Sequence, residues 1–157
     1  MSTGDTDLLE ELRKIVTDDS SRIEKLRQIA ALIRSSGSYR WVGLYNVDRQ
    51  AGEVVNLVWD GPSAPEYPTF PIGKGLTGSA IQESKVINVG DVAADTRYLT
   101  AFGSTRSEII VPIFNEQRDQ VVGTIDVESA RANAFNESTE NVLVTCASVI
   151  APLWAAG

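Results

Sequence analysis

Apolar residues recur at helical spacing in two segments at the start of the chain. The first stripe comprises Leu8, Leu9, Leu12, Ile15 and Val16. Polar residues 18–20 interrupt it, and Ser21 followed three positions later by Glu24 is a capping-box pattern that opens a second helix. The second stripe comprises Ile23, Leu26, Ile29, Ala30 and Ile33. Gly37 is a natural end for this helix.

From Arg40 onward the period changes from helical spacing to alternation. Residues 41–47 and 53–59 are predicted strands joined by a turn at 48–52, and Trp41, Gly43, Tyr45 and Val47 share one face of the first strand. Residues 60–71 form a predicted loop rich in Pro and Gly, with extended character near Phe70. A short helix at 75–83 and a short strand at 86–89 follow. Residues 91–106 show no period and are predicted to be a long functional or covering loop.

The last third of the chain carries the clearest strand signal. Residues 107–114 and 121–128 are strongly apolar, and the loop at 115–119 joins them as a hairpin. Asn136 is the predicted cap of a terminal helix whose end Pro152 should bend or fray. The wide apolar stripe of this helix comprises Val142, Leu143, Cys146, Val149, Ile150, Leu153 and Trp154.

This order of elements predicts an α+β fold with a central antiparallel sheet. The N- and C-terminal helices are expected to cover one face, which leaves the other face to the irregular middle of the chain. A sheet face roofed by loops is a natural pocket. We expect a single domain over residues 1–157, with helices in 1–37 and the sheet, pocket loops and C-terminal helix in 38–157.

Acidic residues interrupt the two most apolar strands. Side chains alternate along a strand, so Asp126 and Glu128 point to the same face. If Gln117 lies at the centre of the hairpin, Glu108 is directly opposite Asp126, and like charges across a ladder are unfavourable. A ligand ammonium is one candidate for the positive group that should lie there. In the alternative interpretation this face is solvated, or Arg106 opposite Glu128 neutralises part of the cluster.

The amino-acid composition of the chain excludes several classes of function. The formal net charge is −7 and the 14 basic residues are scattered, which disfavours nucleic acids and anionic membranes as partners. The chain has no apolar run of membrane-spanning length and no basic, apolar signal pattern at its start, so we expect a cytoplasmic protein. No histidine and a single cysteine, Cys146, exclude disulfide frameworks, Cys/His zinc sites and a histidine base. We therefore expect no catalytic residue, no metal and no cofactor.

Three other features have a structural and a functional interpretation. The glycine-rich segment 72–80 does not fit a phosphate loop, because Lys74 is followed by Gly75, and a turn into a helix is favoured. Cys146 lies on an apolar helix stripe and is better explained as a buried structural residue than as a nucleophile. Trp41 and Tyr45 either wall a pocket or belong to the core.

Four segments carry a resemblance to a known family: residues 41–45, 72–80, 107–112 and 123–129. From about Tyr39 to Trp154 the chain resembles a GAF domain, and it is most similar to the free methionine-(R)-sulfoxide reductases within that group. In that family acidic residues hold the amino group of free methionine sulfoxide, and aromatic residues wall the site. By this resemblance those roles fall on Glu108, Asp126, Glu128, Trp41 and Tyr45.

The chain departs from that family at its redox cysteines. The corresponding positions hold Tyr67, Thr77 and Ala101, and none of these side chains supplies a thiolate. The resemblance therefore implies a sensory or regulatory domain that binds a small amine-bearing molecule without redox catalysis. A sulfoxide reductase-like enzyme and a protein-interaction module with a vestigial pocket remain the alternatives. Apolar stripes wider than one sheet face needs predict a homodimer through the terminal helices.

Overall fold

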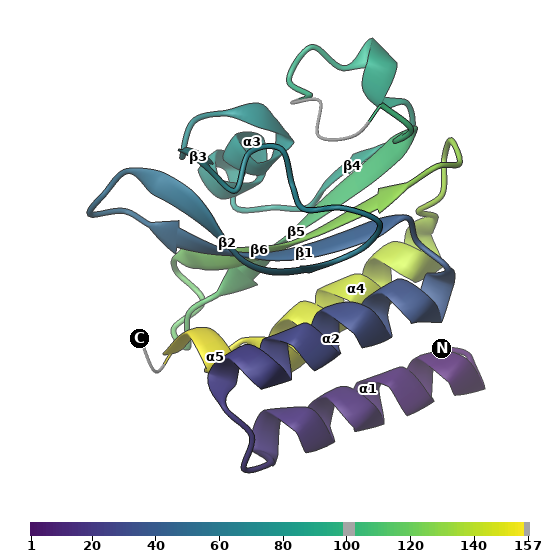
Figure 1. Cartoon of the computed structure of the whole chain (residues 1–157), viewed down its shortest axis with the longest axis vertical. Helices are drawn as coiled ribbons and strands as arrows, with labels where there is room; N and C mark the ends of the chain where they lie inside the picture. The colour runs from purple at the N-terminus through teal and green to yellow at the C-terminus, as the bar shows by residue number, and fades with distance from the viewer. Residues whose placement is uncertain (99–102, 156–157) are drawn as a thin grey trace.

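A six-stranded sheet with the order β3-β2-β1-β6-β5-β4 forms the centre of the computed structural model, which describes residues 1–98 and 103–155 (Figure 1). Every pair of neighbouring strands is antiparallel. The strands are β1 (Trp41–Asp48), β2 (Glu53–Asp60), β3 (Thr69–Pro71), β4 (Ile87–Val89), β5 (Ser107–Phe114) and β6 (Val121–Ser129).

Helices divide between the two faces of the sheet as the sequence predicts. The helices are α1 (Thr3–Thr17), α2 (Arg22–Gly37), α3 (Gly75–Glu83), α4 (Glu137–Ile150), α5 (Pro152–Ala155) and the 3₁₀ turn η1 (Val92–Ala94). Figure 1 shows α2 and α4 against one face and α1 beneath them as an outer layer, whereas α3 and the connecting loops lie over the opposite face. The expected α+β arrangement is confirmed, with the refinement that α1 packs on α2 and α4.

Side-chain caps set the helix ends. Ser21 accepts a hydrogen bond from the backbone N–H of Glu24 at 3.3 Å, and Asn136 accepts one from Thr139 at 2.9 Å, as predicted. The left-handed residue that ends α2 is Ser38, with φ 53°, one position beyond the predicted Gly37. Helix α4 ends at Ile150, and Pro152 begins the separate short helix α5.

The larger apolar core lies between the sheet and the helices. The buried stripe of α1 comprises Leu8, Leu9, Leu12 and Ile15, and it belongs to this core. That stripe is therefore covered within the chain and supplies no free surface to a second copy, so the homodimer stays a prediction without this support. Within residues 1–98 and 103–155, no helix is long and apolar enough to cross a membrane.

The register of the β5–β6 hairpin differs from the predicted one. Glu108 pairs with Glu128, while Asp126 pairs with Ile110, so the predicted pairing of Glu108 with Asp126 is wrong. Arg106 is likewise not opposite Glu128. The cause is a loop that extends from Asn115 to Gln120, together with a bulge at the end of β5. The shift is two residues, and a shift of two keeps every side chain on its face.

Two glycines, Gly78 within α3 and Gly73 just before it, offer a matched test of how this helix is packed. A Cβ on Gly78 would lie 2.7 Å from the carbonyl carbon of Gly73 and 2.8 Å from the oxygen of Ile72, whereas a Cβ on Gly73 would meet nothing within 4 Å. We expect Gly78→Ala to lower the free energy of unfolding by about 1–3 kcal/mol despite its better helix propensity. Gly73→Ala should change it by no more than about 0.5 kcal/mol. Urea unfolding of both variants measures this, and equal stabilities would contradict the packing.

Candidate functional site

The central strands bring the acidic and aromatic residues onto one face of the sheet. In the β1–β6 pairing Glu128 lies opposite Trp41, and Asp126 lies opposite Gly43, so these side chains point the same way. A Cβ on Gly43 would come within 2.3 Å of the Trp41 ring. Glycine at this position therefore lets the indole lie across the strand, beside the acids.

The three carboxyl groups form one buried cluster. One carboxylate oxygen from each of Glu108, Asp126 and Glu128 lies within 4.8 Å of the others. The exposed fractions of these residues are 6%, 7% and 1%. This burial rules out the alternative of a solvated face. Carboxylate oxygens at such distances can hold a cation, either an ammonium group or a hard metal ion.

Hydrogen bonds satisfy only part of this cluster. The hydroxyl of Thr105 donates to Oε1 of Glu128 at 2.7 Å. Oδ1 of Asp126 and Oε2 of Glu128 are buried and have no hydrogen-bond partner among the residues that the structure describes. A buried acceptor without a donor is costly, and these two oxygens are free to accept a hydrogen bond from a ligand or from water.

Burial raises the pKa of each acid, although a hydrogen bond with Glu108 partly lowers that of Asp126. Desolvation is the largest cause for all three, and the charge of Asp126 adds to it at Glu108 and Glu128. The pKa of Asp126 is raised to about 6 and that of Glu128 to about 8, while the pKa of Glu108 is raised well above its ordinary value. Arg40 partly lowers the pKa of Glu128. Desolvation, followed by the charge of Asp126, raises the pKa of Tyr45.

A small cavity of about 40 Å³ opens beside the acids. Glu108, Asp126 and Tyr45 form its floor, and the segment from Pro65 to Thr77 supplies the remaining lining residues. This volume is far below the roughly 300–1,000 Å³ of pockets that enclose drug-sized molecules. In this structure the space beside the acids is therefore too small to enclose a drug-sized molecule.

The aromatic pair occupies two different places around the cavity. Tyr45 lines it, and the ring of Phe70 lies 5.8 Å from the Tyr45 ring. Trp41 is not among the lining residues. Its ring centroid lies 6.4 Å from that of Tyr45, and its Nε1 donates to the carbonyl oxygen of Ser63. Trp41 thus ties the loop after β2 to the sheet.

The predicted roof of the acids is the segment 91–106, of which residues 99–102 lie outside the described residues, so this roof stays a prediction. In the described part of the segment, Thr105 contacts the acids. Residues between β2 and α3 also line the cavity. No sequence pattern marked Thr105 as a site residue. Lys74, which lines the cavity, lies in the glycine-rich segment interpreted from the sequence only as a turn into a helix.

By resemblance, three positions correspond to the redox cysteines of the methionine sulfoxide reductases, and those that the structure describes lie at this cavity. Tyr67 and Thr77 line it, and Ala101 lies outside the described residues. Cys146 lies on α4, on the other side of the sheet, and is fully buried. Desolvation raises the pKa of its thiol to about 12, so the predicted structural role of Cys146 agrees with its surroundings.

Comparison with known families assigns the fold. The family model described as GAF domain matches residues 21–152. The chain belongs to the GAF domain family. It is 29% identical to GAF domain-containing protein A of Dictyostelium discoideum over 136 residues, which cover 87% of this chain and 83% of that protein.

Free methionine-R-sulfoxide reductases are among the relatives of this GAF domain. The Escherichia coli enzyme is 22% identical over 87% of this chain and 80% of its own length. The structure of the Neisseria meningitidis enzyme in complex with its substrate matches with a TM-score of 0.87 and 27% identity, covering 98% of this chain and 91% of that one.

The buried acids predict an unusual dependence of stability on pH. Because folding raises their pKa values from 3.8 and 4.5 to about 6 and about 8, the folded protein keeps protons that the unfolded chain releases. The free energy of unfolding should therefore fall as the pH rises from about 4 to about 8. Asp126→Asn should raise the free energy of unfolding by about 1–3 kcal/mol at pH 8 and have less effect at pH 5.

Urea unfolding across this pH range measures the effect. Glu66→Gln, which removes an exposed acid from the loop over the site, is the control and should leave the pH profile unchanged. An Asp126→Asn variant that is less stable than the parent at pH 8 would show that the charge of Asp126 is already compensated in the empty protein.

Proposed function

We propose that this GAF domain binds a small molecule that carries a protonated amine, in a sensory or regulatory role and without redox catalysis. The observation that carries this proposal is the buried cluster of Glu108, Asp126 and Glu128, in which two carboxylate oxygens lack a donor. An ammonium group supplies three N–H donors and one positive charge, which is the chemistry that this cluster lacks.

The aromatic residues support a cationic ligand. Tyr45 lines the cavity beside Glu108 and Asp126, and Trp41 lies opposite Glu128 in the adjoining strand. Aromatic faces attract cations and exclude water, which strengthens the interaction between an ammonium and a carboxylate. Binding therefore relieves the desolvation and repulsion that raise the pKa values of the acids.

Part of the cavity lining favours a ligand that also bears an anionic group. Lys74 and the first residues of α3, from Gly75 to Thr77, line the cavity together with the acids. Lys74 is the N-cap of α3, and its side chain makes no capping hydrogen bond. Amide groups at a helix start and a lysine attract anions. A free amino acid carries both an ammonium and a carboxylate.

The relatives agree with this ligand class. The matched Neisseria meningitidis structure is a free methionine-R-sulfoxide reductase in complex with its substrate, and methionine sulfoxide is an amino acid with a free ammonium group. Our proposal does not include sulfoxide reduction by this domain. Tyr67 and Thr77 line the cavity without a thiol, and Cys146 is buried with a pKa raised to about 12.

Three further expectations from the sequence belong to this proposal. The domain acts in the cytoplasm, forms a homodimer and passes its signal to a partner protein. None of them is needed for the binding chemistry, and light scattering at high concentration measures the homodimer directly.

Ligand binding should depend on Asp126. We expect the parent to bind free methionine-(R)-sulfoxide or another free amino acid, and Asp126→Asn to weaken that binding at least about tenfold, because a charge-assisted hydrogen bond of roughly 1.5–3 kcal/mol is lost. Isothermal titration in the presence of EDTA, at pH 8, measures the affinity without interference from metal ions.

Two matched controls sharpen this measurement. N-acetylmethionine sulfoxide has the same side chain but no ammonium, so it should not bind the parent. Glu66→Gln, with its acid in the exposed part of the loop, should bind like the parent. Equal affinities of the parent and Asp126→Asn for every amine tested would refute the assignment of the acids as the ligand site.

Sulfoxide reduction should be absent. With free methionine-(R)-sulfoxide and either dithiothreitol or thioredoxin as reductant, we expect no turnover above a blank without protein, because no accessible thiolate reaches the cavity. Activity that disappears in Cys146→Ser would show that α4 opens to expose its thiol. Activity that survives in Cys146→Ser would require a mechanism without cysteine, and either result contradicts the prediction.

A further inference from the structure

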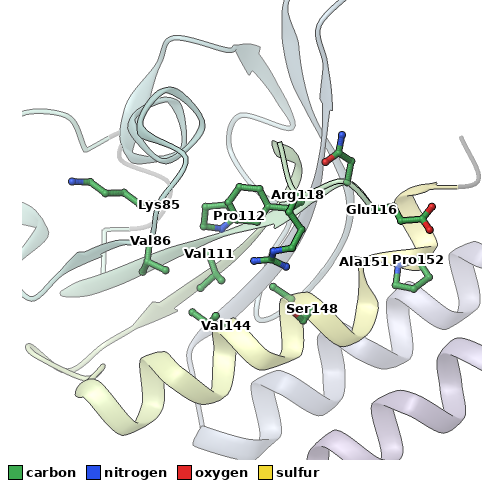
Figure 2. A pocket seen from close by; sticks show the side chains of 13 residues that line it. Lys85, Val86, Val111, Pro112, Glu116, Arg118, Val144, Ser148, Ala151 and Pro152 are labelled. Atoms are coloured by element: carbon green, nitrogen blue, oxygen red, sulfur yellow. The ribbon is translucent and has the colours of Figure 1, made fainter. Parts of the chain in front are cut away.

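A second hollow lies on the helix side of the sheet, away from the acids. It is a groove of about 690 Å³ between α4, the outer edge of β5 and the β5–β6 hairpin loop (Figure 2). Its volume falls within the range of about 300–1,000 Å³ that is typical of small-molecule pockets. It is also much larger than the cavity of about 40 Å³ beside the acids.

The groove forms because strand β4 is short and the facing side chains of α4 are small. Strand β4 pairs with β5 only as far as Ile110, so no strand of the described chain pairs with the outer edge of β5 from Val111 onward. Pro112 lies in this part of β5 and lacks an N–H, which discourages a further strand from pairing there. On α4 and just after it, the residues that line the groove are mostly small: Ala147, Ser148 and Ala151.

The surface inside the groove is largely apolar. Val86, Val111 and Val144 come from three different segments and gather at one end of it (Figure 2). Val144 is 39% exposed and is one of the large hydrophobic side chains left accessible in the described part of the chain. An occupant with an apolar body would bury this exposed surface.

One cation reaches over the groove. Arg118 extends from the hairpin loop toward α4 near Ser148 (Figure 2), with its guanidinium 5.1 Å from the centre of the Phe114 ring. Arg118 forms no ion pair with any residue in 1–98 or 103–155. The amine of Lys85 points away from the other lining side chains and pairs with Glu83.

The loop holds Arg118 in a conformation that arginine rarely adopts. Its φ is 58°, in the left-handed region, and its N–H donates to the carbonyl oxygen of Asn115 at 2.9 Å. The side chain of Asn115 fixes the same loop through the N–H groups of Asp119 and Gln120. Glycine or asparagine would suit this position better. The backbone preference therefore does not explain the arginine, whose guanidinium lies over the groove.

We propose that this groove binds an apolar carboxylic acid, such as a medium-chain fatty acid. The chain of the acid lies along Val86, Val111 and Val144, and its carboxylate accepts hydrogen bonds from the Arg118 guanidinium. The net charge of −7 disfavours a polyanion or an anionic membrane at the same place.

Titration of the full chain with decanoate, below the concentration at which decanoate forms micelles, tests the proposal. Decanol and decyltrimethylammonium have the same tail with a neutral or positive head. We expect decanoate to bind with one site per chain, decanol to bind at least about tenfold more weakly, and the cation not to bind. Val144→Asp places a negative charge in the apolar part and should abolish binding.

Charge variants separate the guanidinium from the general basicity of the region. Arg118→Gln should weaken decanoate binding about tenfold and leave decanol binding unchanged, whereas Lys85→Gln should behave like the parent. Arg118→Gly removes the same charge while suiting the left-handed backbone, so it keeps the loop folded if Arg118→Gln does not.

Two results would overturn the proposal. One is decanoate binding that is absent in the parent or unaffected by Arg118→Gly. The other is a parent dimer, detected by light scattering, that Val144→Asp dissociates, because the groove would then be a contact between copies of the chain.

Discussion

The desolvation of three carboxyl groups is the constraint on which the candidate site depends. Glu108, Asp126 and Glu128 project from adjacent strands into a space that excludes bulk water, and their pKa values rise as a result. A sheet with these acids is less stable above neutral pH than one with apolar residues in their place. Their position is explained if the free energy lost in the empty protein is recovered when a cation binds.

The other face of the sheet supplies the stability that this arrangement requires. Helices α2 and α4 pack on it, and α1 packs on both helices. The larger hydrophobic core therefore lies on the face of the sheet away from Glu108, Asp126 and Glu128. Burial of apolar surface there offsets the cost of the acids through the shared strands β5 and β6. Alternate residues of the same strands therefore point to opposite faces, one set into the hydrophobic core and the other toward the candidate site.

The sequence was sufficient for the parts of the fold that follow local rules. The caps at Ser21 and Asn136 and the alternation along β1, β5 and β6 predicted the helices, the strands and the face that the acids share. The sequence could not predict the register of the β5–β6 hairpin. A bulge and the left-handed Arg118 lengthen the loop between the two strands, and no local sequence pattern encodes by how much. The acids were still predicted on the correct face, because the register error was two residues and a shift of two leaves each side chain on the same face.

The remaining parts of the site come from contacts between residues distant in sequence. Thr105 reaches Glu128 across 23 positions, and Trp41 reaches the loop at Ser63 across 22. Such contacts form only after the sheet has assembled, so neither has a periodic signal. Like charges that face each other across the hairpin, by contrast, violate a local pairing rule. The sequence alone indicated such a conflict, although it placed Asp126 opposite Glu108 where the structure has Glu128. In this GAF domain the violated rule, rather than any favourable pattern, indicates the candidate site, because proteins break such local rules most often at functional sites.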